Sequence, residues 1–279
     1  MKRNIKLIAI KLISISCILN SALAKDIVFP ATNDNTSYKS VTELSYRKPD
    51  EKVRYGDGQY QYGWFWRSTD DADKSPVIVL IHGGCWLNAF DVKHSFPLAT
   101  ALNQLGFNVW SIEYSRTGDN EGGWPGTYYD IEKALKKASH LWQNDLLLLG
   151  HSAGGHLALL AAAKLNDKQI KGVIGLAAIS DIKAYSEGAN SCQSATAKFM
   201  GGDAVALPTA YQMANPVNYP VVLKTWLLQG DSDTIVPMAQ ADRLPQAEKI
   251  IVAKAGHFDW IHPGSSAFKR LAKLLKSLK

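Results

Sequence analysis

One short segment of the sequence places a serine where a covalent catalyst would need it. The segment GHSAG (150–154) has a glycine two positions to either side of Ser152. It follows the apolar run DLLLLG (145–150) and opens a stretch with helical spacing, which is the strand-turn-helix context of a nucleophile elbow. The glycines matter because this tight turn exposes the serine hydroxyl and leaves no room for side chains beside it. We therefore predict that Ser152 is a nucleophile rather than a small residue in a simple turn.

A serine hydroxyl is a weak nucleophile until a base takes its proton. In chains with such an elbow the serine is followed first by an acid and then by a histidine. Two histidines lie late enough, His257 in KAGHFDW and His262 next to Pro263. His257 directly follows the apolar run EKIIVAKA (248–255), so a loop at the end of that strand would present it to the serine. We predict His257 as the base and His262 as a surface loop residue.

The acid that orients this histidine is expected after the preceding strand. There the segment LLQGDSDTIVP (227–237) offers Asp231 and Asp233. Because Gly230 ends the strand and makes the turn, an acid two positions beyond Asp231 can point back toward His257. We predict Asp233 as the acid and Asp231 as a residue that caps or braces the loop. Asp259 is the poorer candidate, since it would have to fold back on its own loop.

Two backbone N–H groups must stabilise the negative charge that forms on the attacked carbonyl oxygen. Ala153, directly after the nucleophile, would supply one. The loop HGGCW (82–86) follows the buried run PVIVLI (76–81), and its glycines allow the backbone to approach a substrate. We predict Gly84 as the second donor, with Gly83 next.

Other histidines and aromatic residues receive supporting roles. His82 is expected to brace the oxyanion loop by a hydrogen bond, and Trp86 to contact the substrate. Four further rings could line an aromatic pocket or could equally pack in the core: Trp124, Tyr128, Tyr129 and Trp260. His94 and His140 are interpreted as ordinary polar positions.

The sequence gives no reason to expect a metal or another cofactor. His151 lies inside the elbow and His156 on the first turn of the following helix. No His-Glu-x-x-His motif and no paired cysteine spacing accompanies them. We therefore predict no metal site and no cofactor.

Strands and helices alternate along the chain in the order that would position this site. Six short runs are continuously apolar, as expected of strands with both faces buried: 76–82, 107–113, 145–150, 170–179, 224–230 and 248–255. Helical spacing occurs at 97–105, 125–142, 155–165 and 266–279, and residues 59–66 alternate like a half-exposed strand. The pattern predicts an α/β fold with a mostly parallel sheet and helices on both faces.

Residues 181–220 interrupt this alternation, with several Gly and Pro and little strand character. We interpret them as a small insertion over the carboxyl edge of the sheet, within one domain of residues 25–279. The last helix has an apolar and a basic face. It is predicted to close the sheet with its basic face in solvent, and a membrane-surface role is the alternative.

The first 24 residues have the pattern of a secretory signal peptide. A basic start precedes the apolar stretch Leu12 to Leu19, and Ala22 and Ala24 occupy the small-residue cleavage positions. We predict cleavage after Ala24 and a periplasmic or secreted protein without stable membrane insertion, because the apolar stretch is too short to span a bilayer. A lipoprotein signal at Cys17 is the weaker alternative.

Charge and cysteine content narrow the possible partners. Removing the four basic residues of the signal from the 31 Lys and Arg leaves 27 against 25 Asp and Glu, a formal charge of +2. No basic stripe remains to indicate a nucleic-acid partner. Cys85 and Cys192 also remain, and the sequence leaves open whether they pair or stay free.

Five motifs together resemble those of the α/β-hydrolases, and within them the esterase and kynurenine-formamidase-like group. In chain order they are HGGCW, IEYSRTGDNEGGWPGTYYD, LGHSAGGHLAL, LLQGDSDTIVP and AGHFDWIHP, and the similarity runs from about Val77 to Pro263. The resemblance implies the α/β-hydrolase fold. It also implies Ser152 as nucleophile, Asp233 as acid, His257 as base, and the loop 82–86 with Ala153 as the oxyanion hole.

The leading hypothesis is an exported serine hydrolase that cleaves a small-molecule carboxylic ester through an acyl-enzyme intermediate. The same triad would also serve an amide, as in an arylformamidase or a peptidase. Export is unusual for formamidase chemistry in this group, which favours the ester. A catalytically silent hydrolase fold used for binding is the hypothesis from another class, although such a scaffold has no need for an intact triad. No long hydrophobic lid is evident, which favours short or soluble acyl groups.

Overall fold

The computed structural model describes residues 26–69 and 75–279, so the predicted signal peptide lies outside the described residues. The described chain forms an eight-stranded sheet in the order β1-β2-β4-β3-β5-β6-β7-β8. Strands β3 to β8 run parallel, and β1 and β2 pair antiparallel beside β4 at one edge. The strands are β1 (Glu51–Arg54), β2 (Tyr62–Trp66), β3 (Val77–Ile81), β4 (Asn108–Ile112), β5 (Leu146–His151), β6 (Ile170–Leu176), β7 (Lys224–Gly230) and β8 (Glu248–Val252). The mostly parallel sheet predicted from the apolar runs is confirmed.

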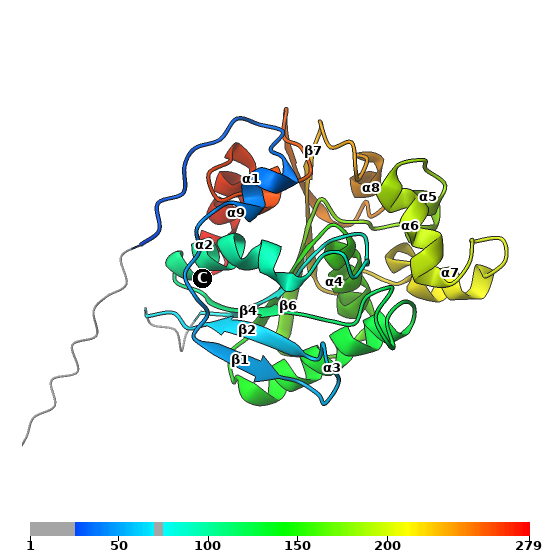
Figure 1. Cartoon of the computed structure of the whole chain (residues 1–279), viewed down its shortest axis with the longest axis horizontal. Helices are drawn as coiled ribbons and strands as arrows, with labels where there is room; N and C mark the ends of the chain where they lie inside the picture. The colour runs from blue at the N-terminus through cyan, green and yellow to red at the C-terminus, as the bar shows by residue number, and fades with distance from the viewer. Residues whose placement is uncertain (1–25, 70–74) are drawn as a thin grey trace, which may run out of the picture.

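Helices cover both faces of this sheet, as the alternation predicted (Figure 1). The longer ones are α2 (Phe96–Gln104), α3 (Gly126–Leu141), α4 (Ala153–Lys164), α6 (Ser191–Met200) and α9 (Ser266–Lys276). The short ones are α1 (Tyr38–Thr42), α5 (Ile182–Ser186), α7 (Pro208–Ala214) and α8 (Ala239–Asp242). Three 3₁₀ turns complete the described elements: η1 (Val92–Ser95), η2 (Pro216–Asn218) and η3 (Asp259–Ile261).

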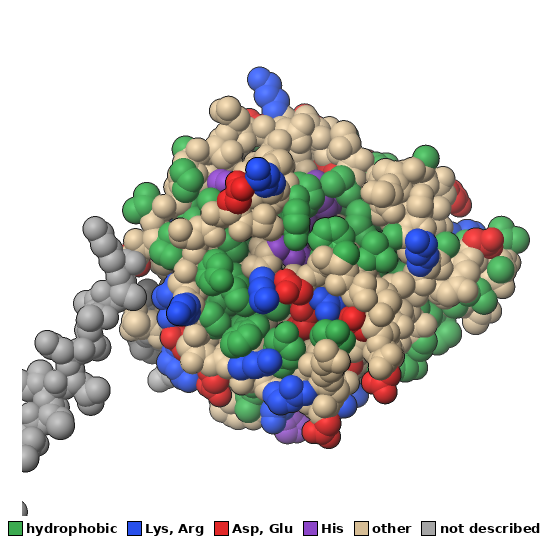
Figure 2. Space-filling view, in the orientation of Figure 1, with side chains coloured by type: hydrophobic (Ala, Val, Ile, Leu, Met, Phe, Trp, Pro, Cys, Tyr) green, Lys and Arg blue, Asp and Glu red, His purple; other side chains and the backbone are tan. Residues whose placement is uncertain are grey.

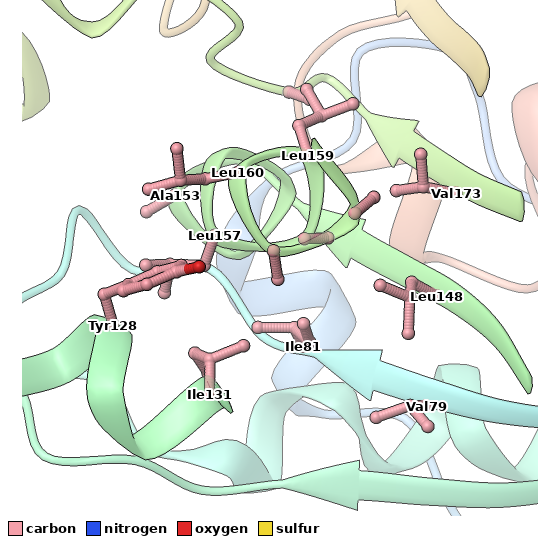
Figure 3. Packing of buried hydrophobic residues seen from close by; sticks show 14 of the residues in the cluster. Val79, Ile81, Tyr128, Ile131, Leu148, Ala153, Leu157, Leu159, Leu160 and Val173 are labelled. Atoms are coloured by element: carbon pink, nitrogen blue, oxygen red, sulfur yellow. The ribbon is translucent and has the colours of Figure 1, made fainter. Parts of the chain in front are cut away.

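Alternate residues of the central strands point to two separate cores. In β3, Val79 and Ile81 belong to the core under α3 and α4, whereas Ile78 and Leu80 belong to the core under α2 and α9. All five residues of β3 are buried, which explains why the run is apolar without alternation. Figure 3 shows Val79, Ile81 and Leu148 of the sheet below Leu157 and Leu160 of α4.

The terminal helix α9 lies against the second core. Its Phe268, Leu271 and Leu275 are buried there, while Lys269 and Lys273 lie outside that core. The apolar face is therefore used for packing, as predicted. Among the described residues, no helix combines the length and apolarity that crossing a bilayer requires.

Residues 182–218 form α5, α6, α7 and η2 between β6 and β7 (Figure 1). These helices lie to one side of the sheet, and Tyr185, Phe199 and Tyr211 from them are buried in the first core. The segment predicted as an insertion is thus helical and is packed onto the rest of the fold.

Candidate active site

Ser152 lies between β5 and α4 in a backbone conformation that few residues adopt. Its φ is 55° and its ψ is −120°, and α4 begins at the next residue. A Cβ added to Gly150 would lie 2.3 Å from the Gly154 carbonyl oxygen, and one added to Gly154 would lie 2.2 Å from the Ile81 carbonyl oxygen. The two glycines are therefore required by close backbone contacts. The strained serine is held by this packing, as is common at functional sites.

His257 is hydrogen-bonded to Asp233. The ring Nδ1 donates to Asp233 Oδ2 at 2.8 Å, and the two side chains are 5% and 0% exposed. The other carboxylate oxygen, Oδ1, accepts hydrogen bonds from the backbone N–H groups of Ile235 and Val236, both at 2.8 Å. Because Nδ1 carries the proton, Nε2 of His257 is left as the nitrogen that can accept one. Ser152 and His257 line the same cavity, so the structure brings together all three residues predicted as a triad.

The other two candidate acids make different contacts. Asp231 is exposed, and its Oδ1 accepts a hydrogen bond from the Lys254 backbone N–H at 2.6 Å. This contact braces the loop after β8, which is the role expected of Asp231. Asp259 is fully buried but accepts hydrogen bonds from the backbone of Asn35 and Thr36.

The loop predicted to supply oxyanion donors lies directly against the elbow. A Cβ added to Gly83 would be 2.9 Å from the His151 carbonyl oxygen and 3.1 Å from Ser152 Cβ, so a larger residue there would displace the elbow. Gly84 lines the cavity with a φ of +112°. Ala153 is the first residue of α4, where a backbone N–H has no partner within the helix. Of the three residues predicted as the oxyanion hole, Gly83 and Ala153 thus lie beside Ser152, and Gly84 lines the same cavity.

A buried ionic network holds this loop in place, and His82 is its centre. His82 Nδ1 lies 2.8 Å from the Gly83 carbonyl oxygen, and its Nε2 lies 2.8 Å from Glu113 Oε1. Glu113 also accepts from the Val92 backbone at 3.0 Å and from Arg116 at 3.1 Å. Burial alone would raise the pKa of Glu113, but His82 and Arg116 together lower it below its ordinary value. The bracing role predicted for His82 is present, and Glu113 was not anticipated.

The cavity above Ser152 has a volume of about 430 Å³ and mostly apolar walls. Figure 2 shows histidine side chains among hydrophobic ones on this face, between α1 and the helices α5 and α6. The hydrophobic walls come from several parts of the chain: Tyr38, Leu87, Phe90, Ile235 and Phe258. An uncharged group of moderate size fits such a site.

Cys85 and Cys192 form a disulfide, with their Cα atoms 5.1 Å apart. Cys85 belongs to the oxyanion loop, and Cys192 lies in the first turn of α6. Both residues line the cavity. The sequence left open whether these two cysteines pair, and in the structure they do. Their bond joins the inserted helices to the site.

The side chain of Trp86 does not contact the cavity, contrary to the prediction. It is fully buried and stacks on Phe199 of α6 with ring centroids 4.7 Å apart. A φ of 59° at Trp86 turns the ring into the core rather than toward the substrate side. Trp86 therefore anchors the oxyanion loop. The four other proposed rings lie outside the cavity wall as well: Trp124, Tyr128, Tyr129 and Trp260.

Two histidines are more buried than predicted. His262 is 3% exposed rather than a surface residue, because the segment around Thr32 covers its loop and bonds to the Gly264 carbonyl. His94 lines the cavity, and burial, with help from His82, lowers its pKa to about 3. His140 is exposed, as expected of a polar position.

The two histidines near Ser152 have structural contacts. His151 Nε2 donates to the His257 carbonyl oxygen at 3.0 Å, and burial lowers the pKa of His151 well below its usual value. His156 Nε2 donates to the Ala214 carbonyl oxygen at 2.7 Å. In the described part of the chain, no group of three or more His, Cys, Asp or Glu side chains is placed to hold a metal ion.

Residues 66–247 match the BD-FAE family, and this segment is more than half of the chain. The chain belongs to the BD-FAE family. The BD-FAE segment contains Ser152 and Asp233 and ends before His257. It also excludes the N-terminal residues up to 65, which include Tyr38.

Curated relatives of this BD-FAE chain include named esterases. It is 30% identical over 125 residues to esterase LipC of Mycobacterium tuberculosis, covering 42% of this chain and 30% of that protein. It is 29% identical over 147 residues to versiconal hemiacetal acetate esterase of Aspergillus parasiticus, covering 50% and 46%. The chain thus spans less than half the length of these relatives.

Solved structures similar to this BD-FAE chain establish the fold. Esterase B from Lactobacillus Rhamnosis superimposes with a TM-score of 0.71 at 18% identity, covering 86% of this chain and 89% of that one. A truncated carbohydrate esterase from gut microbiota gives a TM-score of 0.68 at 18% identity, covering 90% and 99%. The α/β-hydrolase fold implied by the motifs is confirmed.

Proposed function

We propose that this chain is a serine hydrolase that cleaves carboxylic esters, with Ser152 as nucleophile, His257 as base and Asp233 as the orienting acid. One observation carries the proposal. The His257 Nδ1–H group donates a hydrogen bond to Asp233, and the same imidazole lines one cavity together with Ser152. The carboxylate holds the ring in the tautomer whose Nε2 can accept a proton, which is the arrangement that activates a serine. The esterase names of the relatives support the choice of bond.

In the first half of the reaction Ser152 Oγ attacks the ester carbonyl carbon, and its proton passes to His257 Nε2. The carbonyl π electrons move to oxygen, where the N–H groups of Gly84 and Ala153 stabilise the charge. The tetrahedral species then collapses, the C–O bond to the alcohol breaks, and the alcohol leaves with the proton from Nε2. The acyl group remains on Ser152.

In the second half a water molecule gives its proton to His257 Nε2 and attacks the acyl carbon. Collapse of this tetrahedral species breaks the bond to Ser152 Oγ, which takes the proton back from Nε2. The carboxylic acid leaves, and the site returns to its starting state. Asp233 keeps its negative charge throughout, because its role is to orient and stabilise the protonated imidazole.

The walls of the cavity support an uncharged, partly apolar substrate. None of the lining residues among the described ones is Lys, Arg, Asp or Glu. A charged acyl or alcohol group would therefore lose its hydration without gaining a partner. Esters of short to medium carboxylic acids fit both the volume and the chemistry of this site.

Hydrolysis of nitrophenyl esters, run beside a formanilide and a peptide anilide, tests this proposal. Wild-type protein should cleave the acetate or butyrate ester, and Ser152→Ala should lose at least a thousandfold in kcat/KM while retaining its unfolding temperature. If the protein cleaves one of the amides faster than every ester, its function is amide hydrolysis instead. Equal activity of wild type and Ser152→Ala would reject Ser152 as nucleophile.

We also propose that the chain is exported and cleaved after Ala24. The pattern of residues 1–24 and the Cys85–Cys192 disulfide support this, because disulfides persist in oxidising compartments. Mass spectrometry of the protein from a periplasmic or culture-medium fraction should find Lys25 at the N-terminus. A cytosolic protein that keeps residue 1, and in which Cys85 and Cys192 are both alkylated without prior reduction, would contradict the proposal.

A further inference from the structure

The segment of residues 26–50, here called the leader segment, lies on the active-site side of the molecule. It precedes the part of the chain that matches the family. Its helix α1 is drawn near the upper end of β7, opposite the inserted helices α5 and α6 (Figure 1). Tyr38, the first residue of α1, lines the cavity that contains Ser152 and His257.

Tyr38 makes ring contacts with both sides of this cavity. Its ring centroid lies 5.6 Å from that of Phe90, which follows the oxyanion loop, and 5.5 Å from that of Phe258, which follows His257. It also lies 5.7 Å from the ring of His94. Aromatic rings at these separations and angles attract one another. Tyr38 therefore connects the loop of the oxyanion donors with the loop of the base.

A buried carboxylate fastens the leader segment to the loop of His257. Asp259 Oδ2 accepts from the Asn35 backbone N–H at 2.7 Å, and Oδ1 accepts from the Thr36 backbone N–H at 3.0 Å and from the Thr36 hydroxyl. Oδ2 also accepts from the Gly256 N–H, next to His257. One fully buried side chain thus ties the two segments together.

Two glycines allow the leader segment to pack closely on that loop. A Cβ added to Gly256 would lie 2.2 Å from Asn35 Oδ1, and one added to Gly264 would lie 1.8 Å from the Pro30 carbonyl oxygen. Real Cβ atoms do not approach a backbone atom so closely, so position 264 requires glycine, whereas a side chain at position 256 would displace the Asn35 amide. This complementary fit holds α1 at one place over the cavity.

We propose that the leader segment is a working part of the active site, in which Tyr38 is the wall that limits the size of the apolar group a substrate can place beside Ser152. Asp259 acts as a positioning residue that keeps this wall on the loop of His257. The inference rests on the proposed ester hydrolysis and adds the residue that sets acyl-chain length. An apolar wall discriminates by about tenfold or more per added methylene when the cavity is full.

The test compares Tyr38→Ala with Tyr46→Ala in the full chain. Tyr46 is the matched control, because it lies in the same leader segment but packs on Phe96 and does not line the cavity. The measurement is kcat/KM on the nitrophenyl acetate, butyrate, hexanoate and octanoate. Tyr38→Ala should raise the hexanoate-to-acetate ratio by about tenfold, because removal of the ring extends the cavity. Tyr46→Ala should leave the ratio within twofold of wild type.

If the alanine variant fails to fold, Tyr38→Trp tests the same proposal, because it should change the hexanoate-to-acetate ratio in the opposite direction. The larger ring should lower the hexanoate-to-acetate ratio, while Tyr38→Phe should leave it unchanged. Labelling rates with an ethyl and an octyl fluorophosphonate should follow the same order without turnover. If both Tyr38→Ala and Tyr38→Trp keep the wild-type hexanoate-to-acetate ratio, Tyr38 does not limit the acyl-chain length. The proposed ester hydrolysis would be unaffected by that result. Failure of the wild type to cleave any ester or to label would reject the proposed function and, with it, this inference.

Discussion

Cys85 and Cys192 join the loop that carries Gly84 to the first turn of α6, across a sequence separation of 107 residues. The two cysteines belong to segments that sequence order keeps far apart, and their bond forms part of the cavity wall. The oxyanion loop is thereby attached to the core of the inserted helices, where Trp86 also stacks on Phe199. Two independent contacts thus fix the loop on the same helix.

Replacing both cysteines with serine should therefore lower both stability and turnover. A cross-link that closes a loop of this length stabilises the folded state by about 3–5 kcal/mol, mainly through the unfolded chain. Urea unfolding of wild type and the Cys85→Ser/Cys192→Ser variant should show a loss of this size. Reductant should shift the wild type toward the variant and leave the variant unchanged. If the unfolding free energies agree within 0.5 kcal/mol, on the order of a neutral surface substitution, the cross-link does not support the fold.

The two acids after β7 should differ sharply in their effect on catalysis. Asp233→Asn exchanges the acceptor of His257 Nδ1 for an amide that favours the wrong tautomer of the ring, so kcat should fall by about 10⁴. Asp231→Asn, whose carboxylate is exposed and accepts hydrogen bonds from the Ser232 hydroxyl and the Lys254 backbone N–H, should lower kcat by less than about tenfold. Steady-state kinetics on one nitrophenyl ester compares them. The reverse order would assign the acid to Asp231.

The backbone of the oxyanion loop can be tested at Gly84. Its φ of +112° strains any other residue, and a new Cβ would meet Phe90 Cβ at 2.5 Å. Gly84→Ala should displace the N–H donor and lower kcat by about 10² to 10³, the usual effect of losing one donor.

Gly201→Ala is the matched control for this backbone change. Gly201 ends α6 with a φ of +82° and has nothing within 4 Å of a new Cβ. It should cost about 1 kcal/mol of unfolding free energy and leave kcat unchanged. Equal kcat losses in both variants would show that the effect at Gly84 is general strain and not loss of a donor.

His156 should make the fold sensitive to acid. Burial between aromatic rings lowers the pKa of His156 from 6.5 to about 4, although its hydrogen bond to the Ala214 carbonyl oxygen acts to raise it. Between these values the unfolded chain binds a proton that the folded chain does not. The stability from the neutral ring is therefore complete above pH 6.5 and is lost as the pH falls toward 4, by about 1.4 kcal/mol per pH unit.

Urea unfolding between pH 4 and pH 7.5 checks this dependence. His94 contributes an acid slope of its own, so the informative quantity is the difference between variants. His156→Gln, which keeps a donor for Ala214, should flatten the slope, whereas His140→Gln at an exposed position should leave it as in wild type. An unaltered slope in His156→Gln would mean that this ring does not stay neutral in the folded chain.

The strands, the turn at Ser152 and the choice of Asp233 could be predicted from the sequence, because each depends on residues close to it in the chain. The apolar run of β3 shows its burial on both faces directly, and the glycines around Ser152 mark a turn that excludes side chains. Asp233 could be chosen over Asp231 because the turn at Gly230 decides which carboxylate points back. Each of these inferences depends on neighbours within a few residues.

The remainder of the site depends on contacts between distant segments. Tyr38 lies in a polar segment without strand or helix pattern, and only the fold shows that it meets Phe90 and Phe258. Trp86 is the last residue of the glycine-rich loop and was predicted to contact a substrate, but its positive φ turns its ring onto Phe199. His262 looked exposed because nothing in its own loop covers it. Such contacts leave no pattern in the sequence.

Reaction of the protein with a biotinylated fluorophosphonate, followed by peptide mass spectrometry, tests the central claim most directly. Only an activated serine forms the phosphonyl adduct, so wild-type protein should carry one adduct on the peptide that contains Ser152. Ser152→Ala should carry none, and His257→Gln should react at least a hundredfold more slowly because no base removes the proton. An adduct on another serine, or equal labelling of wild type and Ser152→Ala, would contradict the assignment of Ser152, His257 and Asp233 as the catalytic residues.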